Sequence, residues 1–249
     1  AFGYQMRFDL EKGFPAITTK KLAWKSVVSE LLWFLEGSND ERRLAEILYE
    51  DDRENLEGKK TIWTQNAKAD YWKNKSNFDG DVGKIYGVQW RDFYGVDQIK
   101  NLIKGLKESP DSRRHILTAW NPAELDEMSL PPCHAFSQFY LSNNKLSCQL
   151  YQRSCDMFLG VPFNIASYSI LIHIMAKECG YELGEFIHSL GDFHIYEEHF
   201  EQVKIQLTRD PKKLPVLKFN QKKLHEYKTS DFELIDYEHH PKIVALMNV

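Results

Sequence analysis

The segment 164–179 most constrains how this chain can fold, because it reads as a helix without a polar side. Its apolar side chains point in every direction around the helix axis and leave no wide polar face. They are Ile165, Tyr168, Ile170, Leu171, Ile172, Ile174 and Met175. A helix that is apolar all round is buried, and Gly180 can end it. The sequence therefore predicts a central helix that other elements surround.

Two strand-like runs, 134–141 and 145–155, lie on either side of Asn143-Asn144. Asparagine tolerates the left-handed backbone conformations that a tight hairpin turn requires. The runs therefore predict a β-hairpin with these two asparagines as its loop.

The register of this hairpin matters for Cys133, which directly precedes the first run. Regular pairing from the turn places Cys133 opposite Ser154, and Arg153 then faces the other side of the sheet. A β-bulge, which inserts one extra residue into a strand, would bring Cys133 and Arg153 together. Their approach thus requires either a bulge or a long reach by the arginine.

The remaining elements alternate between strands and helices. They are predicted at 4–10 (strand), 23–35 (helix, ended by Gly37), 99–106 (helix, ended before Pro110) and 115–120 (strand). The charged run 38–60 predicts a solvated surface segment. This order favours the α+β class over a doubly wound parallel sheet. We expect one domain over 1–249, with a large, mostly antiparallel or mixed sheet flanked by helices.

Composition limits the partners and the compartment. Lys and Arg number 32 against 36 Asp and Glu, a net charge of -4 that disfavours a nucleic-acid binder. No apolar run approaches the roughly 20 residues of a membrane helix. The 4 cysteines form no Cys-x-x-Cys pair and no zinc-like grouping, so we expect reduced thiols, no metal and a cytoplasmic location. The start at Ala1, without Met, predicts a clipped N-terminus.

Cys133 is the first candidate for chemistry. Pro131 and Pro132 precede it and restrict the backbone, which holds the thiol in a defined place. A nearby arginine, such as Arg153, would favour the nucleophilic thiolate. A buried structural cysteine remains the alternative for Cys133, since cysteine is among the most buried residue types.

Two arginine-containing motifs suggest a phosphate site. Arg153-Ser154 lies in an otherwise apolar hairpin, where an unpaired guanidinium would be costly. Bidentate binding of a phosphate would satisfy it. Arg113-Arg114 follows a proline-marked turn and could join this site, although adjacent arginines are commonly solvated.

Three further side chains could recognise a nucleoside. The amide of Asn164 offers a donor and an acceptor on one plane, which matches a pyrimidine edge with a carbonyl beside a ring N–H. Asn164 could equally cap the buried helix. His194 and Tyr196 alternate, so in an extended segment they point to one side and could bind a sugar hydroxyl.

These motifs together resemble the thymidylate synthase family. The similar runs occur in the family's order, and similarity extends over 2–37, 62–63, 80–90 and 240–249. It is weak over roughly 38–60, 65–79 and 212–235. The motif runs are 112–114 (Ser-Arg-Arg), 130–134 (Leu-Pro-Pro-Cys-His), 149–154 (Gln-Leu-Tyr-Gln-Arg-Ser), 160–168 (Gly-Val-Pro-Phe-Asn-Ile-Ala-Ser-Tyr) and 191–196 (Gly-Asp-Phe-His-Ile-Tyr).

The resemblance implies the family's fold, in which the large sheet packs against its twin in a homodimer. It also implies the reductive methylation of dUMP to dTMP by 5,10-methylenetetrahydrofolate, with release of dihydrofolate. Cys133 would attack C6 of the pyrimidine. The implied dUMP-binding residues are Arg153, Ser154, Asp156, Asn164, His194 and Tyr196, together with Arg113 and Arg114 from the other subunit.

The same resemblance assigns the rest of the site. Glu30, Tyr86 and His134 match the family's network for proton transfer, alongside Cys133 and Asn164 as catalytic residues. The implied folate-binding residues are Lys20, Trp63, Asp156, Leu159, Gly160, Phe163 and Val249, the last in an apolar tail, 246–249, that closes over the ligands.

Two departures from the family pattern stand out. The family's upstream Gly/Thr-rich loop, with a further phosphate-binding arginine, is not part of this sequence. Lys84 and Asn66 occupy positions where the family commonly has Pro and many bacterial members have Trp. Neither substitution removes a chemical group from the mechanism.

Two other functions remain open from the sequence. A pyrimidine hydroxymethylase on the same fold would add water where a synthase transfers hydride, and its cytidylate version has Asp where this chain has Asn164. A non-catalytic nucleotide- or RNA-binding relative is the second alternative. The net charge of -4 does not support RNA binding.

Overall fold

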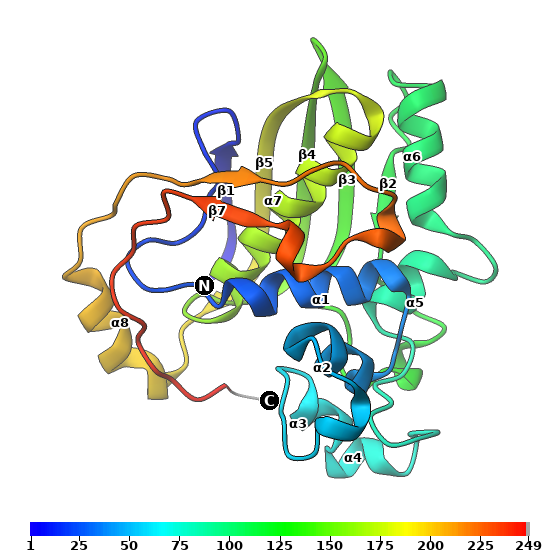
Figure 1. The fold of residues 1–249 in the computed structure, drawn as a ribbon, viewed down its shortest axis with the longest axis vertical. Coiled ribbons are helices and arrows are strands. Elements are labelled where there is room, and N and C mark those ends of the chain that lie inside the picture. Colours follow the sequence, from blue (N-terminus) through cyan, green and yellow to red (C-terminus); the bar gives the residue numbers. More distant parts are fainter. Residues whose placement is uncertain (248–249) are drawn as a thin grey trace.

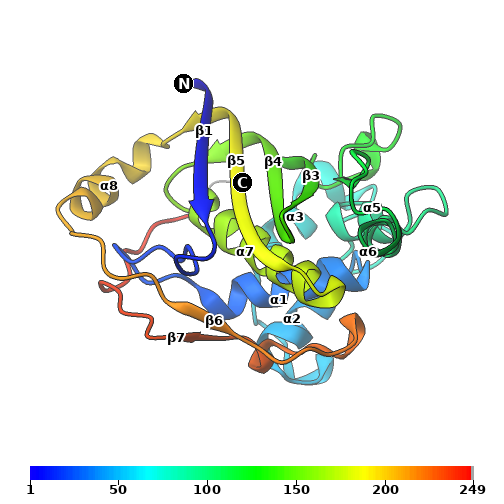
Figure 2. The same cartoon turned by 90° about the horizontal axis from the view of Figure 1, so that it is seen from above.

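A computed structural model describes residues 1–247 of the chain. Its centre is a mixed five-stranded sheet in the order β1-β5-β4-β3-β2. The strands are β1 (Phe2–Asp9), β2 (Ile116–Thr118), β3 (His134–Ser142), β4 (Lys145–Asp156) and β5 (Glu182–His194). Only the β4–β5 pair is parallel. Figures 1 and 2 show α7 along one face of this sheet and α1 beyond α7, which confirms the α+β class with a mixed sheet flanked by helices.

The predicted hairpin is confirmed. Asn143 and Asn144 have positive φ angles of 51° and 63°, and Ser142 pairs with Lys145. The expected register holds as far as Phe136 opposite Tyr151. It then shifts between His134 and Phe136, where a bulge interrupts the ladder. The bulge is therefore present next to Cys133, where the register required one.

The central helix α7 (Gly160–Cys179) is buried along most of its length and ends at Gly180, which has a left-handed φ of 77°. It begins one turn before the predicted start. Its N-cap position is Leu159, so Asn164 lies within the helix. The interpretation of Asn164 as a helix cap is therefore wrong, and its amide is free for another role.

Helix α1 (Trp24–Glu36) packs against α7 and ends at Gly37 in the left-handed region. Both predicted boundaries are confirmed within one residue. The other helices are α2 (Glu41–Tyr49), α3 (Thr64–Ala67), α4 (Asp70–Lys73), α5 (Tyr86–Arg91), α6 (Gln98–Glu108) and α8 (Phe200–Leu207). A second, two-stranded sheet consists of β6 (Val216–Lys218) and β7 (Glu233–Ile235).

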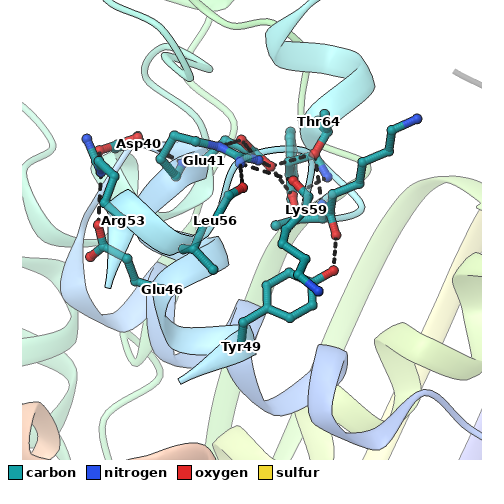
Figure 3. Close-up of polar contacts among 12 residues, drawn as sticks. Asp40, Glu41, Glu46, Tyr49, Arg53, Leu56, Lys59 and Thr64 are labelled. Carbon is teal, nitrogen blue, oxygen red and sulfur yellow. Dashed lines mark hydrogen bonds and ion pairs between the residues drawn. The ribbon is translucent and has the colours of Figure 1, made fainter. Parts of the chain in front are cut away.

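The prediction for the segment 38–60 was wrong in part. The segment was predicted to be a solvated surface, but it contains α2, whose Leu44 and Ala45 are fully buried against α1. Even the charged Glu41 is buried. Figure 3 shows polar side chains of this segment gathered around α2 and the loop that follows it. Residues 51–55 and 57–60 are exposed, as predicted, so the charge content described the loop correctly and missed only the inner side of α2.

The sheet face opposite α7 carries a strip of exposed aromatic and amide side chains. Phe136 and Tyr151 are paired across β3 and β4 and are 41% and 43% exposed, while Tyr140 is 59% exposed. Gln138 and Gln149 lie between them on the same face. We refer to these five residues as the outer strip.

Within residues 1–247, no helix is both long and apolar enough to cross a membrane.

Candidate active site

The bulge in β3 brings Cys133 next to Arg153. The backbone N–H of Arg153 donates to the Cys133 carbonyl at 2.6 Å, and Nη2 of Arg153 lies 3.7 Å from Sγ of Cys133. The guanidinium also donates to the carbonyls of Pro131 (3.1 Å) and Pro132 (3.2 Å) and lies over the Trp120 ring. The two prolines therefore position both the thiol and the cation beside it.

Burial raises the pKa of the Cys133 thiol above its ordinary value, although Arg153 and the hydroxyl groups of Tyr86 and Ser154 each act to lower it. The sequence analysis expected the arginine to favour the thiolate, and its effect has that sign. Desolvation is nevertheless the larger effect, because a partly enclosed thiolate loses more hydration than one cation returns.

Tyr86 and His134 form a stack beside Cys133, and Tyr168 meets His134 edge-on. The backbone N–H of Cys133 donates to the Tyr86 hydroxyl at 2.7 Å, and the Tyr86 ring stacks on His134 with centroids 3.9 Å apart. His134 Nδ1 is 3.0 Å from the Tyr168 hydroxyl. Burial lowers the pKa of His134 to about 3, so its imidazole is neutral. The stack therefore holds neutral, hydrogen-bonding groups beside the thiol.

Glu30 is a buried carboxyl group on α1. Oε1 of Glu30 accepts a hydrogen bond of 2.6 Å from the indole N–H of Trp63. Burial raises the pKa of Glu30 to about 7, and the Trp63 donor acts in the opposite direction. A carboxyl group with this pKa can both bind and release a proton near neutral pH.

A chain of three amide and imidazole groups orients Asn164. Oδ1 of Asn164 accepts from Nε2 of Gln152 at 3.1 Å. Oε1 of Gln152 lies 2.8 Å from Nε2 of His188, a fully buried imidazole. Because Gln152 donates to Asn164 Oδ1, the NH2 group of Asn164 remains available as a donor. The acceptor and donor of this amide therefore have fixed positions.

Asp156 shapes the loop that leads from β4 into α7. Its carboxylate accepts the backbone N–H groups of Phe158 (3.0 Å), Leu159 (3.3 Å) and Gly160 (3.2 Å). Leu159, Gly160 and Phe163 are half-buried on this loop and first helical turn. Asp156 thus holds the loop that carries Leu159 and Gly160, two of the other predicted folate-binding residues.

Lys20 is buried against the same loop. Its ammonium donates to the Phe158 carbonyl and lies 3.5 Å from the centre of the Phe158 ring. Burial lowers the pKa of Lys20 to about 8, while the charge of Asp156 opposes that change. Lys20 therefore carries a cation along the wall of the site.

His194 and Tyr196 come together at the end of β5, with ring centroids 5.0 Å apart. Beyond them, His199 is buried and contacts the rings of both Tyr196 and Phe158. Nε2 of His199 lies 2.7 Å from the carbonyl oxygen of Leu246 in the C-terminal tail. The tail is thus tied to this side of the site. Val249 lies outside the described residues.

Arg113 and Arg114 are exposed, and within residues 1–247 their side chains donate to no other group. The carbonyl of Arg113 accepts from Gln138 of the outer strip at 3.0 Å. The loop that carries both arginines therefore borders the exposed sheet face.

Sequence reasoning missed several members of this arrangement. Gln152, Tyr168 and His199 contact predicted site residues, but none was a candidate. Gln152 offered one signal, since an amide on the inward-facing side of a strand requires a polar partner. His199 offered none, because its contact with Leu246 joins residues 47 positions apart.

The thymidylate synthase family model matches residues 1–249 of the chain. The chain is also 47% identical, over 264 residues, to a thymidylate synthase of Mycoplasma pneumoniae. That similarity covers 97% of this chain and 88% of the relative. Together with the fold and the cysteine-containing site, these similarities define a methyltransferase of nucleotide biosynthesis. The chain belongs to the thymidylate synthase family.

Its reaction is accordingly the reductive methylation of dUMP to dTMP, with 5,10-methylenetetrahydrofolate as the co-substrate and dihydrofolate as the second product. The hydroxymethylase and the non-catalytic relative are not favoured. Among the residues that the structure describes, no group of three or more His, Cys, Asp or Glu side chains could hold a metal ion.

Proposed function

We propose that Cys133 is the nucleophile of this reaction and that Arg153 assists it. The observation that carries this assignment is the 3.7 Å separation between the thiol and the guanidinium, created by the bulge. When the thiolate adds to C6 of the pyrimidine, the C5–C6 π electrons move onto C5 and its neighbouring carbonyl. C5 then becomes the carbon nucleophile that takes the one-carbon unit. A dUMP phosphate near Arg153 and Ser154 would pair with the same cation.

Asn164 is the residue that reads the base. Its Oδ1 retains a lone pair to accept the N3–H of uracil, and its NH2 group can donate to the O4 carbonyl. The hydrogen bond from Gln152 supports this orientation over the reverse one. Asp156 holds the loop beside dUMP, and His194 with Tyr196 binds the ribose hydroxyl, as their 5.0 Å ring separation allows.

Glu30, Tyr86 and His134 provide proton transfer around the pyrimidine. Glu30 has the pKa, about 7, that this role requires. Tyr86 and His134 are neutral, adjacent and hydrogen-bonded to Cys133 and Tyr168 respectively. They can therefore order water molecules without adding charge beside the thiol.

The folate site lies along the loop after β4. Methylenetetrahydrofolate supplies both the carbon and the hydride when it is bound. The residues of this chain that would hold it are Lys20, Trp63, Asp156, Leu159, Gly160, Phe163 and Val249. The buried cation of Lys20 suits an anionic part of the ligand, provided that Lys20 leaves the Phe158 carbonyl.

The whole chain, 1–249, acts as one catalytic domain that pairs with a second copy. One continuous set of buried apolar residues links the sheet, α7, α1 and α2. The outer strip supports a homodimer, because exposed aromatics on an extended sheet face are typical of interfaces. The adjacent, exposed Arg113 and Arg114 would enter the partner's phosphate site. The 4 free cysteines are consistent with a cytoplasmic enzyme.

Absorbance of dihydrofolate, formed from dUMP and methylenetetrahydrofolate, tests the function directly. A synthase produces dihydrofolate in step with dTMP. Formation of a hydroxymethylated nucleotide without dihydrofolate would instead show the hydroxymethylase reaction.

Replacement of Asn164 by Asp tests the base assignment. Cytosine presents an amino donor and a bare ring nitrogen, which a protonated Asp can meet and which the amide, in the orientation that Gln152 holds, cannot. We expect the ratio of kcat/KM for dUMP to that for dCMP to fall by about tenfold or more, because each unpaired buried polar group costs roughly 1–3 kcal/mol. An unchanged ratio would exclude Asn164 from base recognition.

Mixing two inactive variants tests the shared site. A Cys133→Ser chain and an Arg113→Ala/Arg114→Ala chain should form mixed dimers in which one site has both defects and one has neither. Random exchange makes half of the dimers mixed, so about a quarter of wild-type activity should return. Activity that stays at the level of the separate variants, after verified subunit exchange, would assign both arginines to their own subunit or to no site.

A further inference from the structure

Glu41, the first residue of α2, makes an unusual number of hydrogen bonds for a buried carboxylate. It is 1% exposed. Its two oxygens accept from Nε and Nη2 of Arg42, at 2.6 Å and 2.5 Å, and from the hydroxyl groups of Thr61 and Thr64, at 2.6 Å each. Figure 3 shows Glu41 and Thr64 facing one another across the loop. We refer to Glu41, Thr61 and Thr64 as the α2 clamp.

The clamp fixes the direction of both hydroxyl protons. A threonine hydroxyl has a single proton, and in both threonines it points to the Glu41 carboxylate. Each hydroxyl oxygen is then free to accept a backbone N–H. Thr61 accepts from the N–H of Trp63 at 3.1 Å, and Thr64 accepts from the N–H of Thr61 at 2.8 Å. Glu41 therefore organises the backbone that carries Trp63.

The other end of this connection is the Glu30 carboxyl group. The indole N–H of Trp63 donates to Glu30 at 2.6 Å. Hydrogen bonds thus link Glu41 to Thr61 and Thr61 to the backbone of Trp63, and the side chain of Trp63 completes the connection to Glu30.

We propose that Glu41 is a positioning residue for the reaction: through Thr61 it holds the Trp63 indole against Glu30 and so keeps that carboxyl group ready for proton exchange. This inference deepens the proposed role of Glu30 and rests on it. Glu41 itself touches neither substrate nor the reacting atoms.

The surroundings of Glu30 explain why the loss of one donor should be measurable. Trp63, from the loop before α3, donates to it, and Tyr86 from α5 and Tyr168 from α7 lie near enough for its charge to raise their pKa. Both phenols remain neutral, because burial raises their pKa well above its ordinary value. Within residues 1–247, Trp63 is the group that donates to Glu30. Its displacement would leave the carboxylate less stabilised and raise the pKa of Glu30.

The first experiment compares Thr61→Val with Thr61→Ser. Valine keeps the shape and removes the hydroxyl, whereas serine restores it. In Thr61→Val we expect the limb of the kcat–pH profile that belongs to Glu30 to move to higher pH by about one unit, the usual effect of one hydrogen bond to a charged group. The KM for dUMP should stay unchanged, and Thr61→Ser should return the wild-type profile. A Thr61→Val profile identical to wild type would overturn the proposal.

Glu41→Gln and Glu46→Gln form a matched pair on the same helix. Glutamine at 41 places an NH2 group against the Arg42 guanidinium and should shift the limb as Thr61→Val does. Glu46 pairs with Arg43 and Arg53 on the outside of α2 and has no connection to Trp63. An equal shift in Glu46→Gln would show that α2 acts only through its stability, and would refute the specific role of Glu41.

The indole N–H resonance of Trp63, identified by its loss in Trp63→Phe, provides a readout without catalysis. In the wild-type protein it should titrate near pH 7 with Glu30, and in Thr61→Val the midpoint should move upward. A titration midpoint that Thr61→Val leaves unchanged would overturn the proposed role of the α2 clamp. Glu30→Gln distinguishes the proposed role of Glu30 from that of the α2 clamp. If Glu30→Gln leaves the kcat–pH profile unchanged, the role of Glu30 in proton transfer is wrong. The Trp63 resonance in the chain with Glu30 still tests the connection through Thr61.

Discussion

The hairpin and central helix (β3, β4 and α7) and the α2 segment (38–64) both bury polar groups, but their sequences encode this burial differently. In the first region the pattern is local. Alternation along the strands and the Asn143-Asn144 turn place Cys133 and Arg153 within one residue of their positions. In the second region Glu41 accepts hydrogen bonds from its neighbour Arg42 and also from Thr61 and Thr64, which lie 20 and 23 residues further along the chain.

The two regions therefore also differ in what a substitution is expected to change. The hairpin and central helix hold the proposed reactive groups, so substitutions there should lower turnover while the fold persists. The α2 segment positions other residues and carries no proposed reactive group. Substitutions there should therefore change the stability of the protein or the pKa of Glu30. Four predictions test this division, beginning with the largest effect.

Cys133→Ser should lower turnover by at least about 1,000-fold while dUMP still binds, because an alcohol is a far weaker nucleophile than a thiolate at neutral pH. The midpoint of urea unfolding should change little, since serine preserves the half-buried position. Turnover and dUMP affinity are measured on the same preparation. A variant that retains more than a few per cent of wild-type activity would refute the covalent role.

Leu44→Ala should lower the free energy of unfolding by about 3 kcal/mol, through lost burial and the remaining cavity. Leu44 is 1% exposed on α2 and belongs to the common core. Leu207→Ala, at a position 80% exposed on α8, is the control and should change stability little. Urea unfolding measures both. Equal stability of the two variants would return the α2 segment to the solvated surface that its charges suggested.

The outcome at Leu44 bears on what sequence alone can predict. The all-apolar pattern of 164–179 located the buried helix because burial on every side leaves an unambiguous signature. The turn residues predicted the hairpin, and the register made a bulge at Cys133 a condition for the Cys133–Arg153 pair. Each of these inferences uses residues close together in the chain.

Contacts between distant residues could not be predicted in this way. Nothing local in the charged run 38–60 shows that Glu41 will meet two threonine hydroxyls, or that Trp63 will reach Glu30. The same holds for His188, whose link to Gln152 joins β5 to β4. Sequence motifs therefore predicted the residues that we propose as reactive groups, while the contacts that orient those residues could be seen only in the structure.

Acid should destabilise the protein through the sheet and central helix. Burial lowers the pKa of His134 and His188 to about 3 and that of His173 to about 4. In the unfolded chain each titrates near 6.5. Below that pH the unfolded state binds more protons than the folded state. The stabilisation is therefore complete above about pH 7 and is lost as the pH falls toward 4.

Between pH 7 and 5 each of these histidines should remove about 2 kcal/mol from the free energy of unfolding. The segment 38–64 contains no histidine and should contribute none of this loss. Urea unfolding at pH 7, 6 and 5 measures the slope. His173→Asn should reduce it by about a third, whereas His225→Gln, at an exposed position, should not. A slope unchanged by His173→Asn would contradict the buried, neutral state of that imidazole.

Arg53→Gln should have the smallest effect, because Arg53 lies on the exposed side of the α2 segment, away from the α2 clamp. Arg53 pairs with Asp40 and with Glu46 (2.9 Å), but its side chain is half exposed. Exposed ion pairs are screened by solvent and contribute about 0–1 kcal/mol. The loss in the free energy of unfolding should therefore stay below about 1 kcal/mol and shrink further in 1 M salt, where screening is stronger.

The kcat–pH profile of Arg53→Gln should match wild type, since Arg53 has no hydrogen bond to Glu41, Thr61 or Trp63. A larger, salt-insensitive loss, or a shifted profile, would mean that the outer ion pairs and the buried clamp act as one unit. The exposed ion pairs of the α2 segment could then no longer be treated as separate from the buried α2 clamp.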